Sequence, residues 1–255
     1  MAKRIMVFFL SVLIIFAGMA FFADEARITH THQGNRQTNA ENNEESAAKK
    51  KQATNKKLPS VSVKDWELML VNKDNPAPDS SMELVELESG YKIDKRIKTA
   101  YDNLLQAALK SDIRLIVLSG YRSLQEQEAI LATDTEDYMA QGYSESEAKK
   151  KALDYVATPG CSEHQTGLAL DVLDDSWYQS GRGLETDFGK SKGGKWLAAN
   201  CADYGFIIRY PEGKEAQTGI KYEPWHIRYV GVESARYIMA NNLSLEEYID
   251  QLKSR

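Results

Sequence analysis

Few residues in this chain are suited to binding a metal through nitrogen or sulfur. It has four histidines and two cysteines among 255 residues. Two of the histidines, His30 and His32, stand in a polar stretch near the N-terminus, where a folded site is not expected. A histidine-based metal site in the folded part of the chain therefore has to use His164 and His226.

The chain also has no excess of basic residues and no internal repeat. Its formal net charge is -5, which argues against a nucleic-acid partner because the sequence does not indicate a basic face. Nothing recurs at a fixed period, so a solenoid or a propeller is not expected. Hydrophobic residues make up 42% of the chain and charged residues 27%, and these proportions fit an ordinary globular domain.

Charged residues are missing from one long run, Ile5 to Ala23. A bilayer-spanning helix needs about 20 predominantly apolar residues, so this run is about long enough to cross. Lys3 and Arg4 precede it, and basic residues before such a run orient the rest of the chain outward. We expect residues 1–23 to be a membrane anchor, and a signal peptide cleaved after Ala20 is the alternative. Both interpretations give an exported protein.

Residues 24–58 are rich in Asn, Gln, Thr, Glu and Lys and have almost no large apolar side chain after Ile28. Such a segment cannot bury enough surface to offset its chain entropy, so we expect a flexible polar tether. The remaining residues, 59–255, have the length of one typical domain.

Hydrophobic spacing and turn residues predict the elements of this domain. The predicted strands are Trp66–Asn72, Ile113–Gly120, Leu168–Val172, Phe206–Tyr210 and Trp225–Val230. The predicted helices are Ile93–Lys110, Ser123–Ala140, Ser144–Ala157, Lys195–Tyr204, Val232–Asn241 and Ser244–Lys253. The letters "SESE" predict a capping box at the third of these helices. Short strands interspersed with helices, without regular βαβ alternation, predict an α+β fold with a small, mainly antiparallel sheet flanked by helices.

The stretch "CSEHQTGLALDV", residues 161–172, combines a histidine with a carboxylate. Its apolar second half predicts a buried strand, and Asp171 inside that strand is costly unless a charged group lies beside it. His226 stands in "YEPWHIRYVG", three residues after Glu223. A catalytic zinc site uses three protein ligands and a water, so His164, Asp171 and His226 form a candidate ligand set. Glu223 would then be a general base beside the metal.

Spacing alone does not exclude a structural role for these residues. A histidine beside a strand is more often a hydrogen-bonded core residue than a ligand, and a glutamate before Pro-Trp-His is usually a turn residue. Cys161 is a rival ligand because it lies close to His164, although an exported thiol is more often oxidised than metallated.

The two cysteines, Cys161 and Cys201, predict a disulfide, because an even count in an exported chain favours pairing. Such a bridge would pin the loop before His164 and contribute on the order of 3 kcal/mol. Two buried, unreactive thiols are the alternative.

Four motifs occur along the chain in this order: Ser119-Gly120-Tyr121-Arg122-Ser123; Ser162-Glu163-His164 with Gly167 and Asp171; Gly205-Phe206 with Arg209-Tyr210-Pro211; and Glu223-Pro224-Trp225-His226. In this combination the chain resembles the VanY-type D-alanyl-D-alanine carboxypeptidases over most of Trp66 to Leu252. The resemblance implies a small α+β fold shared with the hedgehog amino-terminal domain and the D,D-dipeptidases. It also implies that Zn²⁺ is bound by His164, Asp171 and His226. Glu223 is implied as the base.

The same resemblance gives roles to three further residues. Arg122 matches an arginine that polarises the scissile carbonyl or stabilises its oxyanion, and a fixed guanidinium offers paired donors for that task. Ser162 matches a position that binds the terminal carboxylate of the substrate in related dipeptidases. Gln127 is a second candidate for that carboxylate, or else an exposed helix glutamine.

The resemblance implies a membrane-tethered zinc carboxypeptidase that releases D-alanine from the peptide stems of peptidoglycan. We expect it on the extracytoplasmic face of the bacterial cell membrane, or secreted if the N-terminal segment is cleaved. One alternative is an L,D-carboxypeptidase acting on tetrapeptide stems. Another is a non-catalytic wall-binding module with a structural zinc. Glu223 favours an enzyme, because a structural zinc site has no use for a base.

Overall fold

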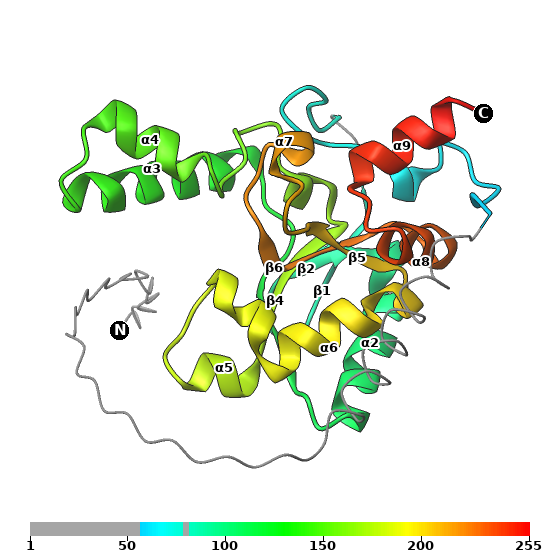
Figure 1. The fold of residues 1–255 in the computed structure, drawn as a ribbon. Helices are drawn as coiled ribbons and strands as arrows, with labels where there is room; N and C mark the ends of the chain where they lie inside the picture. The colour runs from blue at the N-terminus through cyan, green and yellow to red at the C-terminus, as the bar shows by residue number, and fades with distance from the viewer. Residues whose placement is uncertain (1–56, 79–81) are drawn as a thin grey trace, which may run out of the picture. The chain divides into compact units, whose positions relative to one another are not determined.

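The computed structural model describes residues 57–78 and 82–255 (Figure 1). The predicted anchor, residues 1–23, lies outside these residues, and so does the predicted tether as far as residue 56. Both therefore stay predictions. Among the described residues, no helix combines the length and the apolar character that a membrane span needs.

The centre of the fold is a four-stranded sheet in which all neighbouring strands are antiparallel. Its spatial order is β3 (Leu115–Ser119), β4 (Ala169–Asp174), β6 (Glu223–Tyr229) and β5 (Phe206–Tyr210). A separate two-stranded antiparallel sheet pairs β1 (Leu84–Glu86) with β2 (Lys92–Asp94). The predicted α+β fold with a small, mainly antiparallel sheet is confirmed.

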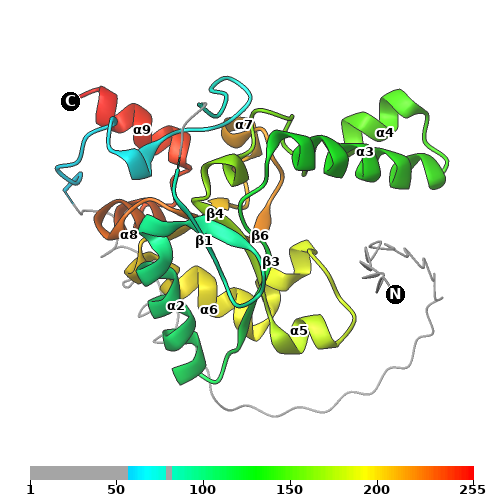
Figure 2. The same cartoon turned by 180° about the vertical axis from the view of Figure 1, so that it is seen from behind.

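Helices surround this sheet (Figures 1 and 2). They are α2 (Lys98–Lys110), α3 (Leu124–Ala140), α4 (Glu145–Ala152), α5 (Asp175–Gln179), α6 (Lys192–Asn200), α7 (Glu215–Thr218), α8 (Val232–Ala240) and α9 (Leu245–Lys253). Helix α6 contacts the three strands β4, β5 and β6, and α8 packs beside β5. Helices α3 and α4 lie side by side as a hairpin that extends away from the sheet in both views.

Serine caps set the start of several helices, as the sequence predicts. Ser144 precedes α4 and forms the predicted capping box with Glu147, in which each side chain binds the backbone N–H of the other residue. Ser123 and Ser244 form the same arrangement at α3 and α9. Gly205 ends the segment after α6 in the left-handed region with φ +84°, which costs glycine little.

Strands β4, β6 and β5 are buried on both faces. Every residue of β4 and β5 is buried, and β6 is buried up to Arg228. Continuous apolar runs are typical of strands with two covered faces. Charged residues inside such strands are therefore the informative exceptions. Four buried side chains that can carry a charge stand at positions inside these three strands, away from the strand ends: Asp171, Arg209, His226 and Arg228.

The predicted strand Trp66–Asn72 is wrong. Trp66–Leu68 forms a single turn of 3₁₀ helix, and the only extended pairing nearby in the described residues is the isolated bridge between Asn72 and Asn75. Leu68 is buried against α8 and α9 rather than in a sheet. The guanidinium of Arg228 donates to the backbone carbonyl groups of Glu67 and Met69, so a side chain takes the place of a partner strand.

Two predicted helices are shorter than expected. Lys92–Asp94 pairs as β2, and the helix predicted from Ile93 becomes regular only at Lys98. Helix α4 ends at Ala152 rather than at Ala157. The chain after it turns, and the Ala157 carbonyl accepts a hydrogen bond from Gln127.

The predicted disulfide between Cys161 and Cys201 is also wrong, since both cysteines are free thiols. Cys201 is fully buried in the main core with Leu197 and Phe206. Burial raises the pKa of its thiol to about 12, so it is inert at neutral pH. Cys161 is partly exposed and lines a cleft beside Tyr210. The two thiols therefore occupy different surroundings.

Candidate active site

The strand register places two of the predicted metal ligands opposite each other. Asp171 in β4 pairs with His226 in β6, and Asp171 Oδ1 lies 3.1 Å from His226 Nδ1. His164 lies in the 3₁₀ turn Glu163–Thr166 before β4, with its Nε2 3.3 Å from Asp171 Oδ2. All three side chains are buried. The structure thus brings together the three residues that the sequence singles out.

Gly167 lets the chain fold back between His164 and β4. It has φ +66°, a conformation that L residues with a side chain rarely adopt. A Cβ at this position would lie 2.8 Å from the backbone nitrogen of Asp94, so the space is closed as well. The seven-residue separation in the sequence becomes a spatial contact because of this turn.

The hydrogen bonds of His164 identify the ring nitrogen that is available to a metal. Its Nδ1 lies 2.7 Å from the carbonyl oxygen of Gly120, which can only accept, so Nδ1 carries the proton. The lone pair is left on Nε2, which faces Asp171. Burial lowers the pKa of His164 to about 4, so the imidazole is neutral at physiological pH, as a ligand must be.

These residues fit a zinc ion by their chemistry and their placement. One ligand atom from each of His164, Asp171 and His226 lies within 4.8 Å of the other two. Two imidazoles and a carboxylate form a donor set that zinc accepts, with one position left open. Asp171 Oδ1 is buried and has no hydrogen-bond partner among the described residues. A cation would compensate that buried oxygen.

The electrostatics of the site favour a positive charge at this place. Burial opposes the charge of Asp171, but His164, His226 and Arg122 outweigh it and hold the pKa of this carboxyl well below its ordinary value. Burial also opposes a charge on His226, yet the carboxylates of Asp171 and Glu163 raise the pKa of that ring to about 9. The carboxylates around His226 therefore stabilise a cation.

Glu223 is at the first position of β6 and is buried, not in an exposed turn. Its Oε2 lies 3.5 Å from His226 Nδ1, next to the ligand cluster. Burial raises the pKa of Glu223 to about 8, closer to neutrality than an ordinary glutamate. A carboxyl group whose pKa lies near the working pH can both take up and return a proton.

Arg122 reaches the edge of the ligand cluster. Its Nη2 donates to Asp171 Oδ2 at 2.6 Å and lies 3.0 Å from His164 Nε2. Ser119 accepts from Arg122 Nε at 2.7 Å, and Gln127 Oε1 accepts from Nη1 at 3.2 Å. The guanidinium is thereby held in one orientation beside the site.

Of the two predicted substrate-binding residues, Gln127 contacts Arg122, and Ser162 directly precedes the turn that holds His164. Gln127 is buried rather than exposed, and its amide is held between Arg122 and the Ala157 carbonyl. It therefore orients Arg122. Ser162 is buried two residues before His164. Binding of a substrate carboxylate by either residue stays a prediction.

Sequence reasoning missed two residues in contact with His226. The ring of Tyr210 packs on His226 with 4.8 Å between ring centroids. Glu163 Oε2 lies 3.8 Å from His226 Nε2. Both residues stand within the four motifs, and Glu163 lies between Ser162 and His164, which have predicted roles. These positions were the one signal that the sequence offered.

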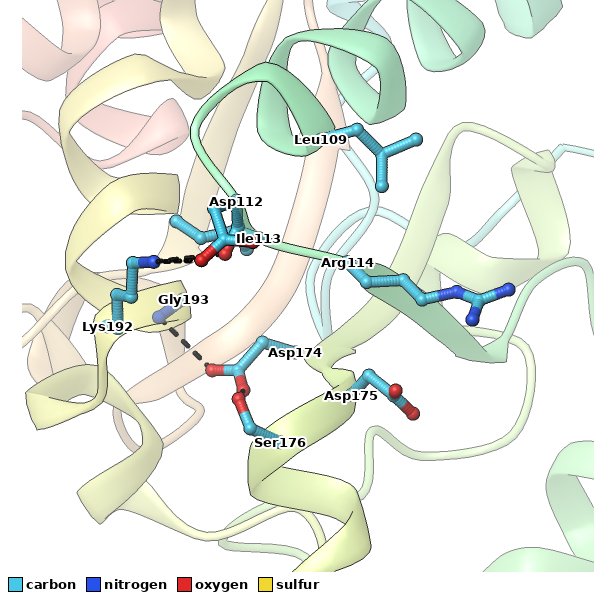
Figure 3. Close-up of a pocket in the computed structure, with 9 residues that line it drawn as sticks. All are labelled: Leu109, Asp112, Ile113, Arg114, Asp174, Asp175, Ser176, Lys192 and Gly193. Atoms are coloured by element: carbon cyan, nitrogen blue, oxygen red, sulfur yellow. Dashed lines mark hydrogen bonds and ion pairs between the residues drawn. The ribbon is translucent and has the colours of Figure 1, made fainter.

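A second cavity lies elsewhere on the molecule (Figure 3) and shares no residue with the ligand cluster. Its walls include Leu109, Arg114 and Asp174. The dashed lines in Figure 3 show that the polar groups here bind each other: Gly193 N–H donates to Asp174, and Lys192 pairs with Asp112. These contacts are structural.

Comparison with known proteins points to one family. The family model for D-alanyl-D-alanine carboxypeptidase (VanY) matches residues 90–232. A D-alanyl-D-alanine carboxypeptidase of Enterococcus faecalis is 39% identical over 229 residues, which cover 89% of this chain and 79% of that protein.

Solved structures agree with this assignment. A point mutant of the vancomycin-resistance D,D-pentapeptidase VanY, from the VanB-type resistance cassette and in complex with Zn(II), matches with a TM-score of 0.66 and 41% identity, covering 72% of this chain and 99% of that one. VanYB in complex with D-alanine-D-alanine gives the same TM-score of 0.66. The L,D-carboxypeptidase LdcB matches with a TM-score of 0.61 and 35% identity, covering 79% of this chain and 96% of that one.

Proposed function

The chain belongs to the VanY family of D-alanyl-D-alanine carboxypeptidases, and from this premise we propose that it removes the C-terminal D-alanine from peptidoglycan stem peptides by zinc-dependent hydrolysis. One observation carries the proposal: a buried carboxylate, Glu223, lies 3.5 Å from His226 and so beside the cluster of buried zinc-type ligand atoms of His164, Asp171 and His226. A zinc site that serves folding alone needs no such group. The non-catalytic alternative leaves this carboxylate without a role.

The proposed ligands are Nε2 of His164, a carboxylate oxygen of Asp171 and Nδ1 of His226. Zinc bound there supplies Lewis-acid chemistry, which polarises the scissile carbonyl and makes a water easier to deprotonate near neutral pH. The protein's part is to bury the three donors and to orient each of them. His164 is oriented by the Gly120 carbonyl.

Glu223 handles the proton. Its carboxylate takes a proton from the water that attacks the terminal peptide carbonyl carbon. It then gives that proton to the nitrogen of the departing D-alanine as the C–N bond breaks. The carboxylate is regenerated, and the products are the shortened stem and free D-alanine. A pKa of about 8 for the buried Glu223 suits both halves of this transfer.

Arg122 stabilises the negative charge that develops on the carbonyl oxygen. Ser119 and Gln127 hold its guanidinium, so the donors are in place before the reaction begins. Ser162 is the proposed partner of the substrate's terminal carboxylate. Gln127 contributes through Arg122.

Defined stem peptides test the proposal. The purified full chain is incubated separately with a pentapeptide stem ending in D-alanyl-D-alanine and with the matching tetrapeptide, and the products are identified by mass spectrometry. We expect D-alanine and the tetrapeptide from the pentapeptide. The matched control is Glu223→Gln, which keeps the side-chain volume and should release little product. Trimming of the tetrapeptide alone would show L,D specificity instead, as in the L,D-carboxypeptidase LdcB.

We also propose that the protein works on the extracytoplasmic face of the bacterial membrane. The uncharged run from Ile5 to Ala23 and the location of peptidoglycan outside the membrane support this placement. Cell fractionation, with protease added to intact spheroplasts, tests it. We expect the protein in the membrane fraction and accessible to the protease, and protection from the protease would contradict the proposal.

A further inference from the structure

Glu163 is a buried carboxylate that the proposed mechanism does not use. It lies directly before His164 in the turn Glu163–Thr166, and its side chain is 0% exposed. A buried charge is costly unless it is paired and hydrogen-bonded. The buried charge of Glu163, beside the ligand cluster, must therefore be compensated by specific partners.

Two buried arginines compensate this charge. Arg209 in β5 donates from Nε to Glu163 Oε1 at 2.7 Å, and Arg228 in β6 donates from Nη1 to the same oxygen at 2.5 Å. Arg209 also forms two hydrogen bonds with Glu246 in α9. Two glutamates and two arginines balance the charge of this group, which we call the arginine–glutamate cluster.

The cluster leaves one oxygen of Glu163 for His226. Both arginines bind Oε1, and Oε2 has no hydrogen-bond partner among the described residues. Nε2 of His226 is likewise buried and without a partner in the described part of the chain. These two atoms lie 3.8 Å apart. On the other side of the ring, Nδ1 faces Asp171.

A neutral imidazole that ligates a metal has its lone pair on one nitrogen and a proton on the other. The N–H group needs an acceptor, and that acceptor decides which nitrogen is left for the metal. For His164 the acceptor is the carbonyl oxygen of Gly120. For His226, the group placed to accept from Nε2–H is Glu163 Oε2.

We propose that Glu163 is a positioning residue for the metal ligand His226. In the zinc-loaded protein, Oε2 closes from its present 3.8 Å to accept the Nε2–H of the ring, which keeps the Nδ1 lone pair directed at the metal. Arg209 and Arg228 fix the carboxylate in this orientation. The arginine–glutamate cluster therefore connects the ligand set to α9, through Glu246. This inference rests on the proposed zinc site.

A pair of isosteric variants separates this role from general support of the fold. Glu163→Gln keeps the volume, and its carbonyl oxygen can still accept from the arginines, but the group that then faces His226 Nε2 is an amide NH2, which cannot accept. Glu246→Gln is the matched control, because it removes one negative charge from the same cluster at a residue that contacts Arg209. Zinc affinity of the full chain is measured by competition with a chromophoric chelator. Unfolding of both metal-free variants is measured in parallel.

We expect Glu163→Gln to bind zinc about 10- to 100-fold more weakly than the natural protein, the range found for partners of metal-bound histidines. Glu246→Gln should bind zinc as the natural protein does. Equal zinc affinity in Glu163→Gln and the natural protein would overturn the inference while leaving the proposed function intact. Equal losses in both variants would also overturn it, because the cluster would then act only on the fold.

The tautomer of His226 gives a test that needs no stable variant at position 163. The zinc-loaded natural chain, labelled with ¹⁵N-histidine, has four histidines whose ring nitrogens can be assigned by NMR. We expect the proton of His226 on Nε2 and the metal on Nδ1, and the reverse assignment would overturn the inference. Failure of the natural chain to bind zinc at all would overturn the proposed function together with this inference.

Discussion

Asp171 and His226 face each other across neighbouring antiparallel strands, with 3.1 Å between Oδ1 and Nδ1. Side chains alternate between the faces of a strand, so a shift of one residue would move one of them to the opposite face. The buried apolar residues on both strands keep the register. The metal site therefore depends on the packing of the sheet core.

Loss of a ligand should remove zinc and activity together. His226→Ala takes away one of three proposed donors, so we expect zinc affinity to fall by more than the ~100-fold typical of losing an outer partner. D-alanine release should fall in parallel. Metal analysis, a release assay and far-UV circular dichroism on one preparation check this. A folded His226→Ala protein that keeps its zinc would show that His226 is not a ligand.

Glu223→Gln should separate catalysis from metal binding. The three proposed ligands are untouched, so one zinc per chain should remain bound. Turnover should drop by ~10²- to 10⁴-fold, the usual contribution of a general acid–base group. Zinc content and turnover are measured on the same samples. If zinc is lost as in His226→Ala, Glu223 is a ligand; near-normal turnover with zinc retained would place the base elsewhere.

Arg122→Ala should lower turnover without weakening zinc binding. Loss of an oxyanion donor costs ~10²- to 10³-fold in kcat. The positive charge of Arg122 lies 3.0 Å from His164 Nε2, so its removal should leave zinc affinity unchanged or higher. Arg114→Ala, at an exposed residue of the cavity in Figure 3, is the control and should change neither quantity. Weaker zinc binding in Arg122→Ala would contradict this division of roles.

The sequence predicted the site better than its surroundings. His164, Asp171 and His226 stand in short motifs whose chemistry is readable residue by residue, and β5 has the predicted bounds. The arginine–glutamate cluster was not predicted, because its members are spread along the chain from Glu163 to Glu246 and a charged residue ordinarily indicates surface. Only the folded sheet shows that these charges neutralise one another.

The predicted disulfide and the predicted strand near Trp66 were wrong for related reasons. The number of cysteines does not say how far apart they lie in the fold. Cys201 lies in the core, and Cys161 lies beside a cleft. The run Trp66–Asn72 has strand-like composition, but Arg228 satisfies its carbonyl groups and Leu68 packs on helices. Tertiary contacts overrode the local preference in both places.

Asp174 should make stability depend on pH. Burial opposes its charge, but hydrogen bonds from Ser176, Trp177 N–H, Ser191 and Gly193 N–H outweigh burial and lower its pKa. Because the folded pKa lies below the unfolded value of about 3.9, the stabilisation is present above that pH and is lost as pH falls through the folded pKa.

Asp174 is the N-cap of α5, where it accepts from the Trp177 N–H. Asp174→Ala should therefore be less stable than the natural protein near neutral pH by about 0.5–2 kcal/mol, the cost of losing a helix cap. The difference should shrink in acid. Urea unfolding of metal-free protein at several pH values measures it. Asp112→Asn, at an exposed acid near the same cavity, serves as the control: it removes a charge, keeps a residue type that tolerates the φ of +55° at this position, and should show little change. A pH-independent difference would show that the charge of Asp174 does not contribute.

The most direct test of the central claim is a zinc titration of the chelator-treated full chain with the pentapeptide stem as substrate. We expect no D-alanine release before zinc is added, a rise with each addition, and saturation at one zinc per chain. Release that persists after complete removal of zinc, or a chain that binds zinc at the proposed site and releases no D-alanine, would contradict the account.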